Sequence, residues 1–187
     1  SASRVAPWLA SLPPAEQLGL PLLESAASLA GLLQGSHLVE RLARLQQDLR
    51  AEFQGLEADV FVNDRALFPE AAFTEERYLW AHAIGLSRGL PAQDGELSLL
   101  PLLDVANHAE GAQHTWAAAA TTGDVALLAG GKIGEGDAVT VDYSRGEPKG
   151  TWEYFFSHGF VPQPEGASDE EAAAWWLEAG GRPMQLA

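Results

Sequence analysis

The segment Leu100–His108 reads LPLLDVANH. Its first part is apolar, and its second part carries the polar residues Asp104, Asn107 and His108. We interpret the apolar run, from Leu97 to Val105, as a strand buried on both faces, with the three polar side chains at its mouth, where a cleft could form. The alternative is a turn in which the side chains of Asp104 and Asn107 bond nearby backbone and His108 lies on the surface, and spacing alone favours this turn.

The segments that follow this stretch also predict strands. They are short, apolar or alternating, and bounded by Gly and Asp: Thr115–Ala119, Val125–Ala129 and Ala138–Tyr143. The segments between them carry the residues of tight turns, at Thr122-Gly123-Asp124 and Gly134-Glu135-Gly136-Asp137. The second half of the chain is therefore expected to be rich in strands.

The last of these strands ends in a tyrosine, Tyr143, followed by the polar turn Ser144-Arg145-Gly146. A phenol at this place could hydrogen-bond a reacting amine, orient a methyl donor or, less readily, act as a base. The structural alternative is an amphipathic tyrosine with a packed ring and a hydrated hydroxyl group. Position along the strand alone favours this structural alternative.

The first half of the chain predicts helices. Apolar residues recur at spacings of three and four from Leu38 to Leu56, behind a plausible N-cap at Gly35-Ser36, and form one stripe of an amphipathic helix. A second helix is predicted from a cap at Thr74 to about Arg88, where Gly89 ends it. Helices followed by strands predict an α+β fold.

An aromatic run occupies residues 152–160, which read WEYFFSHGF. It predicts a short helix over residues 152–157 that ends before Gly159. We expect at least Phe155 and Phe156 to belong to the core. The aromatic faces could also wall a pocket for a cationic side chain.

Composition excludes several classes of function. The 187 residues fit one domain with a helical appendage. The 26 acidic and 11 basic side chains give a net charge of −15, which argues against nucleic-acid binding and favours a basic protein partner. The absence of cysteine excludes thiolate catalysis, disulfides and cysteine-bound zinc, and no HExxH spacing supports another metal site. No apolar stretch is long enough to cross a membrane.

Taken in order, four segments resemble the SET-domain protein methyltransferases, and among them the subclass typified by the Rubisco large-subunit lysine methyltransferase. The segments are Phe73–Glu76 continuing through Trp80-Ala81 to Ser87-Arg88, then Leu100–His108, then Ile133–Gly136 with Val139–Tyr143, and finally Glu153–Val161. Their order and the gaps between them make the match fairly specific. The resemblance covers about residues 5 to 162.

The resemblance implies an organisation in three parts. Residues 1–96 would be a mainly helical SET insertion, residues 97–162 the C-terminal half of the SET β-fold, and residues 163–187 a C-terminal helix and tail where a substrate-binding domain would start. A capping box at Ser168–Glu171 predicts that C-terminal helix. In the family a Gly-rich cofactor-binding turn precedes the insertion, and nothing before Pro7 matches it, so we expect the chain to be an excerpt of a longer protein.

The resemblance also implies a cofactor, S-adenosylmethionine, and methyl transfer to the lysine side chain of a protein substrate. Arg88 would hold the carboxylate end of the cofactor, for which its forked guanidinium is complementary. Tyr143 would be the catalytic tyrosine beside the path of the methyl group. The positions that match the family's cofactor-binding residues are Ser87, Arg88, Asp104, Asn107, His108 and Phe160.

One position departs from the family. Relatives usually carry Asp-Tyr-Gly-Phe where this chain has Ser157–Phe160, so His158 replaces a pocket tyrosine and is the candidate substrate-binding residue. Three functions stay open: a protein-lysine N-methyltransferase, a protein-histidine methyltransferase, and a non-catalytic SET-like module that binds a basic protein partner. No metal, nucleic acid or membrane is expected, and the implied location is soluble and intracellular, in the cytoplasm, nucleus or chloroplast.

Overall fold

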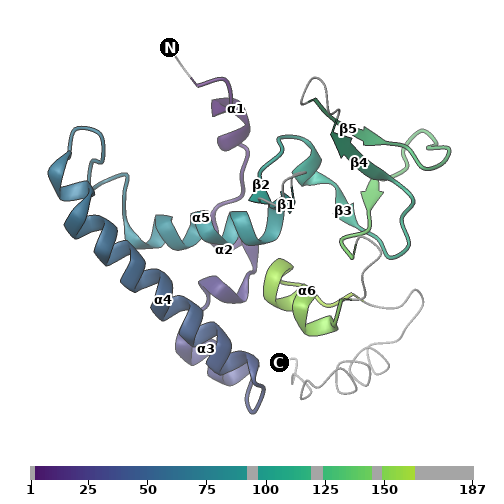
Figure 1. The fold of residues 1–187 in the computed structure, drawn as a ribbon. Helices are drawn as coiled ribbons and strands as arrows, with labels where there is room; N and C mark the ends of the chain where they lie inside the picture. Colours follow the sequence, from purple (N-terminus) through teal and green to yellow (C-terminus); the bar gives the residue numbers. More distant parts are fainter. Residues whose placement is uncertain (1–2, 92–96, 119–123, 145–148, 163–187) are drawn as a thin grey trace. The chain divides into compact units, whose positions relative to one another are not determined.

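The computed structural model describes residues 3–91, 97–118, 124–144 and 149–162 (Figure 1). Two units make up the chain. We call residues 1–12 and 88–149 the strand unit, and residues 13–87 and 150–187 the helical unit. Helices and three small sheets account for the regular structure of the described residues, none of which form a helix long and apolar enough to cross a membrane.

The helical unit contains two long helices and several short ones. In chain order they are α2 (Ala15–Leu18), the 3₁₀ turn η1 (Pro21–Leu23), α3 (Ala26–Leu32), α4 (Leu38–Asp59), the 3₁₀ turn η2 (Phe61–Asn63), α5 (Glu75–Arg88) and α6 (Thr151–His158). Helix α3 packs along α4, and the 3₁₀ turn η1 contacts both α4 and α6 (Figure 1).

Helix α4 confirms the first predicted helix. The hydroxyl of Ser36 accepts the Leu38 N–H at 3.2 Å, and the leucine stripe is buried from Leu38 onward. One polar residue, Gln46, lies on the same stripe and is only 4% exposed. Its side-chain nitrogen donates to the carbonyl oxygens of Leu22 at 2.9 Å and Glu24 at 2.8 Å. A glutamine on the buried face thus joins α4 to η1 by two hydrogen bonds.

Helix α5 confirms the second predicted helix, and α6 confirms the short aromatic one but is one residue longer at each end than the predicted range 152–157. The Thr74 hydroxyl accepts the Arg77 N–H at 3.3 Å at the start of α5. Helix α6 ends at Gly159, whose φ of 76° is a left-handed conformation that glycine adopts without strain.

Among the aromatic residues of α6, Tyr154 is buried and Trp152, Phe155 and Phe156 are partly buried. Phe155 and Phe156, expected in the core, pack against a cluster of buried leucines on α3 and α4. The guanidinium of Arg41 lies over the rings of Trp152 and Phe156, 4.8 and 5.0 Å from their centroids. The cation that these aromatic faces meet therefore comes from the chain itself.

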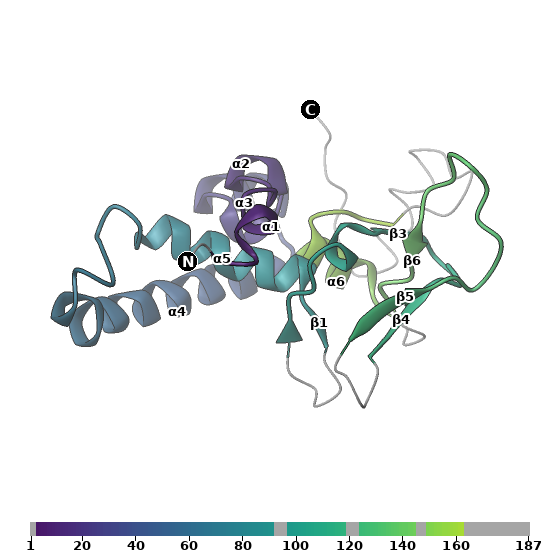
Figure 2. The same cartoon turned by 90° about the horizontal axis from the view of Figure 1, so that it is seen from above.

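The strand unit consists of short elements. They are α1 (Ala6–Leu9), β1 (Leu90–Pro91), β2 (Leu97–Ser98), the 3₁₀ turn η3 (Leu103–Val105), β3 (Asn107–His108), β4 (Thr115–Ala118), β5 (Val125–Leu128) and β6 (Thr140–Val141). Strands β1 and β2 pair antiparallel, as do β4 and β5, whereas β3 and β6 pair parallel with Asn107 opposite Thr140 and His108 opposite Val141 (Figure 2).

The predicted strand over Leu97–Val105 is wrong. Only Leu97–Ser98 is extended and paired, and Leu103–Val105 forms a 3₁₀ turn. Pro101 lacks the N–H that a ladder needs, and Leu102 has a φ of 74°, which no strand tolerates. The stretch is not buried on both faces either, because Leu102 is 81% and Val105 61% exposed.

The other strands are confirmed with shorter bounds. β4 and β5 each end one residue before the predicted bound, and β6 covers only Thr140–Val141 of the expected 138–143. The turn at residues 134–137 is formed, with the Gly134 N–H donating to the Asp137 carboxylate at 2.7 Å. Ala119, most of the turn at 122–124 and the helix expected after Ser168 lie outside the described residues.

The buried glutamine gives a test of the helical core. Replacing it in Gln46→Leu keeps the volume but leaves two carbonyl oxygens without their donor, so we expect a loss of about 1–3 kcal/mol in the free energy of unfolding. The matched control is Gln47→Leu, at the exposed neighbouring position, with an expected change within about 0.5 kcal/mol. Urea unfolding of both variants measures the difference, and equal losses would contradict this role of Gln46.

Candidate functional site

The predicted site residues divide between the two units. The helical unit includes Ser87, and the strand unit resumes at Arg88, so these two neighbouring residues belong to different units. The strand unit contains Arg88, Asp104, Asn107, His108 and Tyr143, and the helical unit contains Ser87, His158 and Phe160. Within each unit, the structure brings most of these residues into contact.

Asp104 is the centre of the group in the strand unit. It lies in η3, and its side chain is fully buried. The indole Nε1–H of Trp8, in α1, donates to its Oδ2 at 3.0 Å. Arg88 Nη1 lies 3.5 Å from the same oxygen and donates to the Asp104 carbonyl oxygen at 3.0 Å. A buried carboxylate is thus held by one indole and one guanidinium group.

The second oxygen of this carboxylate is unsatisfied. Asp104 Oδ1 is buried and has no hydrogen-bond partner among the described residues. Such atoms are rare because an unpaired buried polar group is costly. Among the described residues, Arg88 makes its polar contacts through Nη1, and its side chain remains 23% exposed. Asp104 Oδ1 thus retains the capacity to accept a hydrogen bond, and Nε and Nη2 of Arg88 are the kind of donors that pair with a carboxylate.

Tyr143 and His108 pack against each other beside this group. Their ring centroids are 5.2 Å apart, and the Tyr143 backbone N–H donates to His108 Nδ1 at 3.1 Å. The Tyr143 hydroxyl donates to the Ala106 carbonyl oxygen at 2.7 Å. Burial raises the pKa of Tyr143, the nearby Arg88 lowers it and Asp104 raises it, with a net upward shift. The phenol is therefore protonated at neutral pH, which disfavours the role of base considered for it.

Asn107 occupies an exposed position of β3, opposite Thr140 of β6. It comes directly before His108, whose side chain is almost fully buried. The three polar residues of the segment Leu100–His108 thus lie on a 3₁₀ turn and the strand after it, rather than at the mouth of one long strand.

In the helical unit, His158 and Ser87 meet. His158 Nδ1 lies 3.1 Å from the Ser87 carbonyl oxygen, a hydrogen bond when that nitrogen carries a proton. The Ser87 hydroxyl donates to the Ala83 carbonyl oxygen of its own helix at 2.8 Å. The Phe160 ring contacts those of Tyr154 and His158 at centroid distances of 5.7 and 6.0 Å. The backbone of Ser87, rather than its hydroxyl, is thus joined to the aromatic cluster.

Two residues at the site were not predicted from the sequence. Trp8 lies 96 positions from Asp104, and no local pattern relates the two. Asp142 follows β6, and its carboxylate accepts the N–H groups of Gly111 at 3.0 Å and Ser144 at 2.8 Å. An Asp two residues before a Ser in a turn is a recognisable signal for this second bond.

The pKa of Asp142 is lowered. Burial would raise it, but hydrogen bonds from the side chain and backbone of Ser144 and from the backbone of Gly111 outweigh burial. His108 Nδ1 lies 3.9 Å from Asp142 Oδ1. Asp142 thus joins the end of β6 to the loop after β3 as an ionised group.

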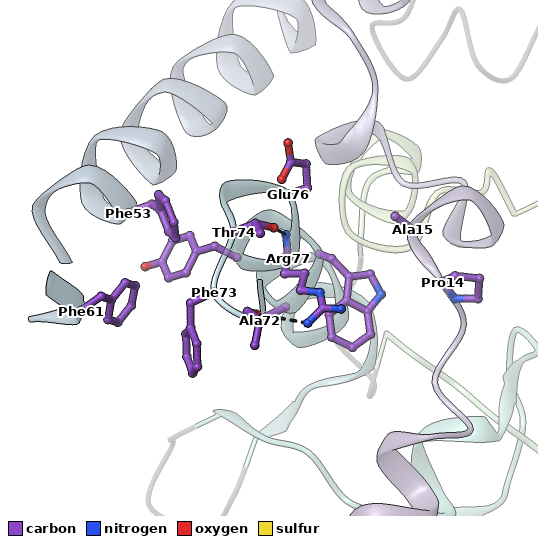
Figure 3. Close-up of a pocket in the computed structure, with 12 residues that line it drawn as sticks. Pro14, Ala15, Phe53, Phe61, Ala72, Phe73, Thr74, Glu76 and Arg77 are labelled. Carbon is purple, nitrogen blue, oxygen red and sulfur yellow. Dashed lines mark hydrogen bonds between the residues drawn. The ribbon is translucent and has the colours of Figure 1, made fainter. Parts of the chain in front are cut away.

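The helical unit also contains an open pocket of about 630 Å³, which no predicted site residue lines. Figure 3 shows Phe53, Phe61 and Phe73 gathered on one side, with Arg77 bonded to the Ala72 carbonyl oxygen at 3.3 Å. Tyr78 and Trp80 complete the aromatic lining. Among the described residues, no group of three or more His, Asp or Glu side chains is placed to hold a metal ion in either unit.

Comparisons with known proteins relate the chain to one kind of domain. No protein-family model matches it. It is similar to "SET domain-containing protein 8" of Schizosaccharomyces pombe (strain 972 / ATCC 24843), with 35% identity over 89 residues, which are 46% of this chain and 20% of that protein. The chain thus spans about a fifth of the length of this curated relative.

Two solved structures show the likeness in three dimensions. The SET domain of LSMT bound to lysine and AdoHcy matches with a TM-score of 0.71 and 22% identity, over 88% of this chain and 37% of that one. Rubisco LSMT bound to AdoMet matches with a TM-score of 0.64 and 23% identity, over 84% of this chain and 35% of that one. At these identities the likeness concerns the fold.

The lowered pKa of Asp142 predicts how stability depends on pH. Its ionised form stabilises the fold above the unfolded-state pKa of about 3.9, and this contribution is lost as the pH falls through the lower folded-state pKa. We expect Asp142→Asn to lower the free energy of unfolding by about 1 kcal/mol at pH 7 and to flatten its fall below pH of about 4. The matched control is Asp48→Asn, at an exposed position of α4. Unfolding curves measured across pH test this, and parallel curves for wild type and Asp142→Asn would contradict it.

Proposed function

We propose, from the premise that this chain is a SET-domain protein, that it is part of an S-adenosylmethionine-dependent protein-lysine N-methyltransferase. Residues 1–96 would be a helical insertion, residues 97–162 the C-terminal half of the SET β-fold, and residues 163–187 the start of a substrate-binding region. The structural neighbours support this proposal, because they are LSMT structures bound to lysine and AdoHcy or to AdoMet.

The observation that carries the proposal is the unsatisfied carboxylate oxygen of Asp104 beside the guanidinium of Arg88. S-adenosylmethionine has a carboxylate, several hydrogen-bond donors and a positive charge. Arg88 would hold the carboxylate through its two unused nitrogens, and Asp104 Oδ1 would accept from a donor. The negative charge of Asp104 also suits a cationic ligand. The residues present therefore fit the cofactor.

Four further residues are proposed as cofactor-binding residues on weaker grounds. His108 lies next to Tyr143, which supports a place at the same site, and Asn107 is its neighbour on β3. Ser87 and Phe160 are proposed as cofactor-binding residues from the resemblance to the family. Both lie in the helical unit together with His158, the proposed substrate-binding residue.

The bound cofactor would supply a methyl group on a positively charged sulfur. This chain's contribution would be to hold donor and acceptor in line and to keep the acceptor amine neutral. Tyr143 suits that task, because its hydroxyl proton is donated to Ala106 and its oxygen presents lone pairs in a site that favours the neutral phenol. An oriented phenol oxygen interacts favourably with a cationic donor, whereas a basic side chain would repel it.

A protein-histidine methyltransferase is the second candidate, and it rests on His158. The imidazole stands where relatives usually carry a tyrosine, and it is held beside the Ser87 carbonyl oxygen. A group with two ring nitrogens would shape the acceptor channel differently from a phenol. The net charge of −15 is compatible with a basic protein substrate for either enzyme, and also with a non-catalytic module that binds a basic partner.

Catalysis by Tyr143 gives the decisive test. In the full-length protein, Tyr143→Phe is expected to lower the single-turnover rate of methyl transfer by about 10²- to 10³-fold, because it removes one preorganised hydroxyl group. Its affinity for S-adenosylmethionine should stay within about threefold, because the charged ends of the cofactor are held elsewhere. Labelled S-adenosylmethionine with lysine-containing and histidine-containing peptides as acceptors measures the rates. The matched control is Tyr78→Phe, a half-buried tyrosine of the helical unit, with an unchanged rate.

Each other outcome identifies an alternative. Transfer to histidine peptides alone would favour the second candidate. If the full-length protein does not bind S-adenosylmethionine, the non-catalytic module that binds a basic partner would be the remaining candidate function. A wild-type rate in Tyr143→Phe would show that this tyrosine is not the catalytic one.

A further inference from the structure

Trp8, in the strand unit, makes a hydrogen bond to Asp104 to which the proposed reaction assigns no role. It lies in α1, a helix of four residues with no buried member, and its own side chain is half-buried. Its indole N–H nevertheless reaches across 96 positions of the chain to a fully buried carboxylate oxygen of Asp104. A tryptophan that only covered apolar surface would not need this bond.

The distances show which group orients the carboxylate. Trp8 Nε1 is 3.0 Å from Asp104 Oδ2, a good hydrogen bond, whereas Arg88 Nη1 is 3.5 Å from that oxygen and makes its shorter bond, 3.0 Å, to the Asp104 carbonyl. The backbone of Asp104 therefore holds Arg88. The rotation of the carboxylate about its own bond is fixed by the indole.

This orientation has a consequence for Arg88. With Oδ2 bonded to the indole, Oδ1 is directed away from that bond and stays unsatisfied. Without the indole bond the carboxylate could turn toward the guanidinium and pair with it in the two-pronged manner that Arg and carboxylates favour. Asp104 would then compete with a ligand carboxylate for Nε and Nη2 of Arg88.

We propose that Trp8 is a positioning residue of the cofactor site, whose indole N–H turns Asp104 so that Oδ1 and Arg88 both stay available to S-adenosylmethionine. This inference rests on the proposed function. It assigns to the N-terminal helix α1 a role in cofactor affinity, acting through Asp104 rather than by contact with the cofactor.

The test compares two tryptophans in the full-length protein. Trp8→Phe removes the N–H but keeps an aromatic ring, and we expect the dissociation constant for S-adenosylmethionine to rise about tenfold, as loss of a hydrogen bond to a charged group would produce. The matched control is Trp80→Phe, which removes the bond from Trp80 Nε1 to the Pro13 carbonyl oxygen, 2.9 Å, within the helical unit. We expect a similar loss of melting temperature in both variants, but an affinity within twofold of wild type in Trp80→Phe.

A spectroscopic measurement keeps the test decisive if Trp8→Phe does not fold. In NMR spectra of the wild-type protein, the indole N–H resonance of Trp8 should shift when S-adenosylmethionine is added. It should also differ between the wild-type protein and Asp104→Asn. The indole N–H resonance of Trp80 should change in neither comparison. In affinity, the double variant Trp8→Phe/Asp104→Asn should be no weaker than Asp104→Asn alone, because the two residues act as one unit.

The outcomes separate the two proposals. Suppose that the wild-type protein binds S-adenosylmethionine. If Trp8→Phe then binds it with the same affinity as Trp80→Phe, or if the Trp8 resonance shifts neither on ligand addition nor in Asp104→Asn, the positioning role is wrong and the proposed function stands. If the wild-type full-length protein does not bind S-adenosylmethionine, the proposed function fails, and the positioning role fails with it.

Discussion

A carboxylate without solvent contact, that of Asp104, is the constraint on which the strand unit depends. Removing a charge from water costs several kcal/mol unless partners replace the solvent. Here the partners come from distant parts of the chain, the indole of Trp8 and the guanidinium of Arg88. They satisfy one oxygen and leave the other without a donor. An arrangement that stops short of full satisfaction is typical of a site that binds a ligand.

The backbone around Asp104 is shaped by the same constraint. In folded proteins leucine and valine are usually buried and aspartate is usually exposed. Here Leu102 and Val105 are exposed and Asp104 is buried. The left-handed conformation of Leu102 and the 3₁₀ turn after it reverse the expected inside and outside of the stretch. The helical unit follows the ordinary rule instead, with a leucine stripe and one buried glutamine, Gln46, whose side-chain nitrogen donates two hydrogen bonds.

Local patterns in the sequence predicted the two long helices and α6, whereas the short helices α1, α2 and α3 were not predicted. The leucine spacing of α4, the Thr74 cap of α5 and the glycine after α6 each act within a few residues, and each is confirmed. The predicted strand over Leu97–Val105 is wrong because Pro101 has no N–H to donate to a neighbouring strand and Leu102 has a positive φ, and the apolar content of the segment reveals neither. Apolar runs interrupted by proline are ambiguous in this way.

Local sequence patterns did not predict the candidate site in the same way. The resemblance to SET-domain proteins, which is confirmed, pointed to Arg88, Asp104 and Tyr143 as members of one site. Spacing alone favoured a plain turn and a plain packing tyrosine. Trp8 had no signal at all, because a hydrogen bond over 96 positions is set by tertiary structure and leaves no local trace.

The most direct measurement is a crystal structure of the full-length protein with S-adenosylhomocysteine. The account predicts the ligand carboxylate on Nε and Nη2 of Arg88, and a ligand donor within about 3 Å of Asp104 Oδ1, with the Trp8 bond to Oδ2 retained. A ligand bound elsewhere, with Asp104 Oδ1 still unsatisfied, would contradict it.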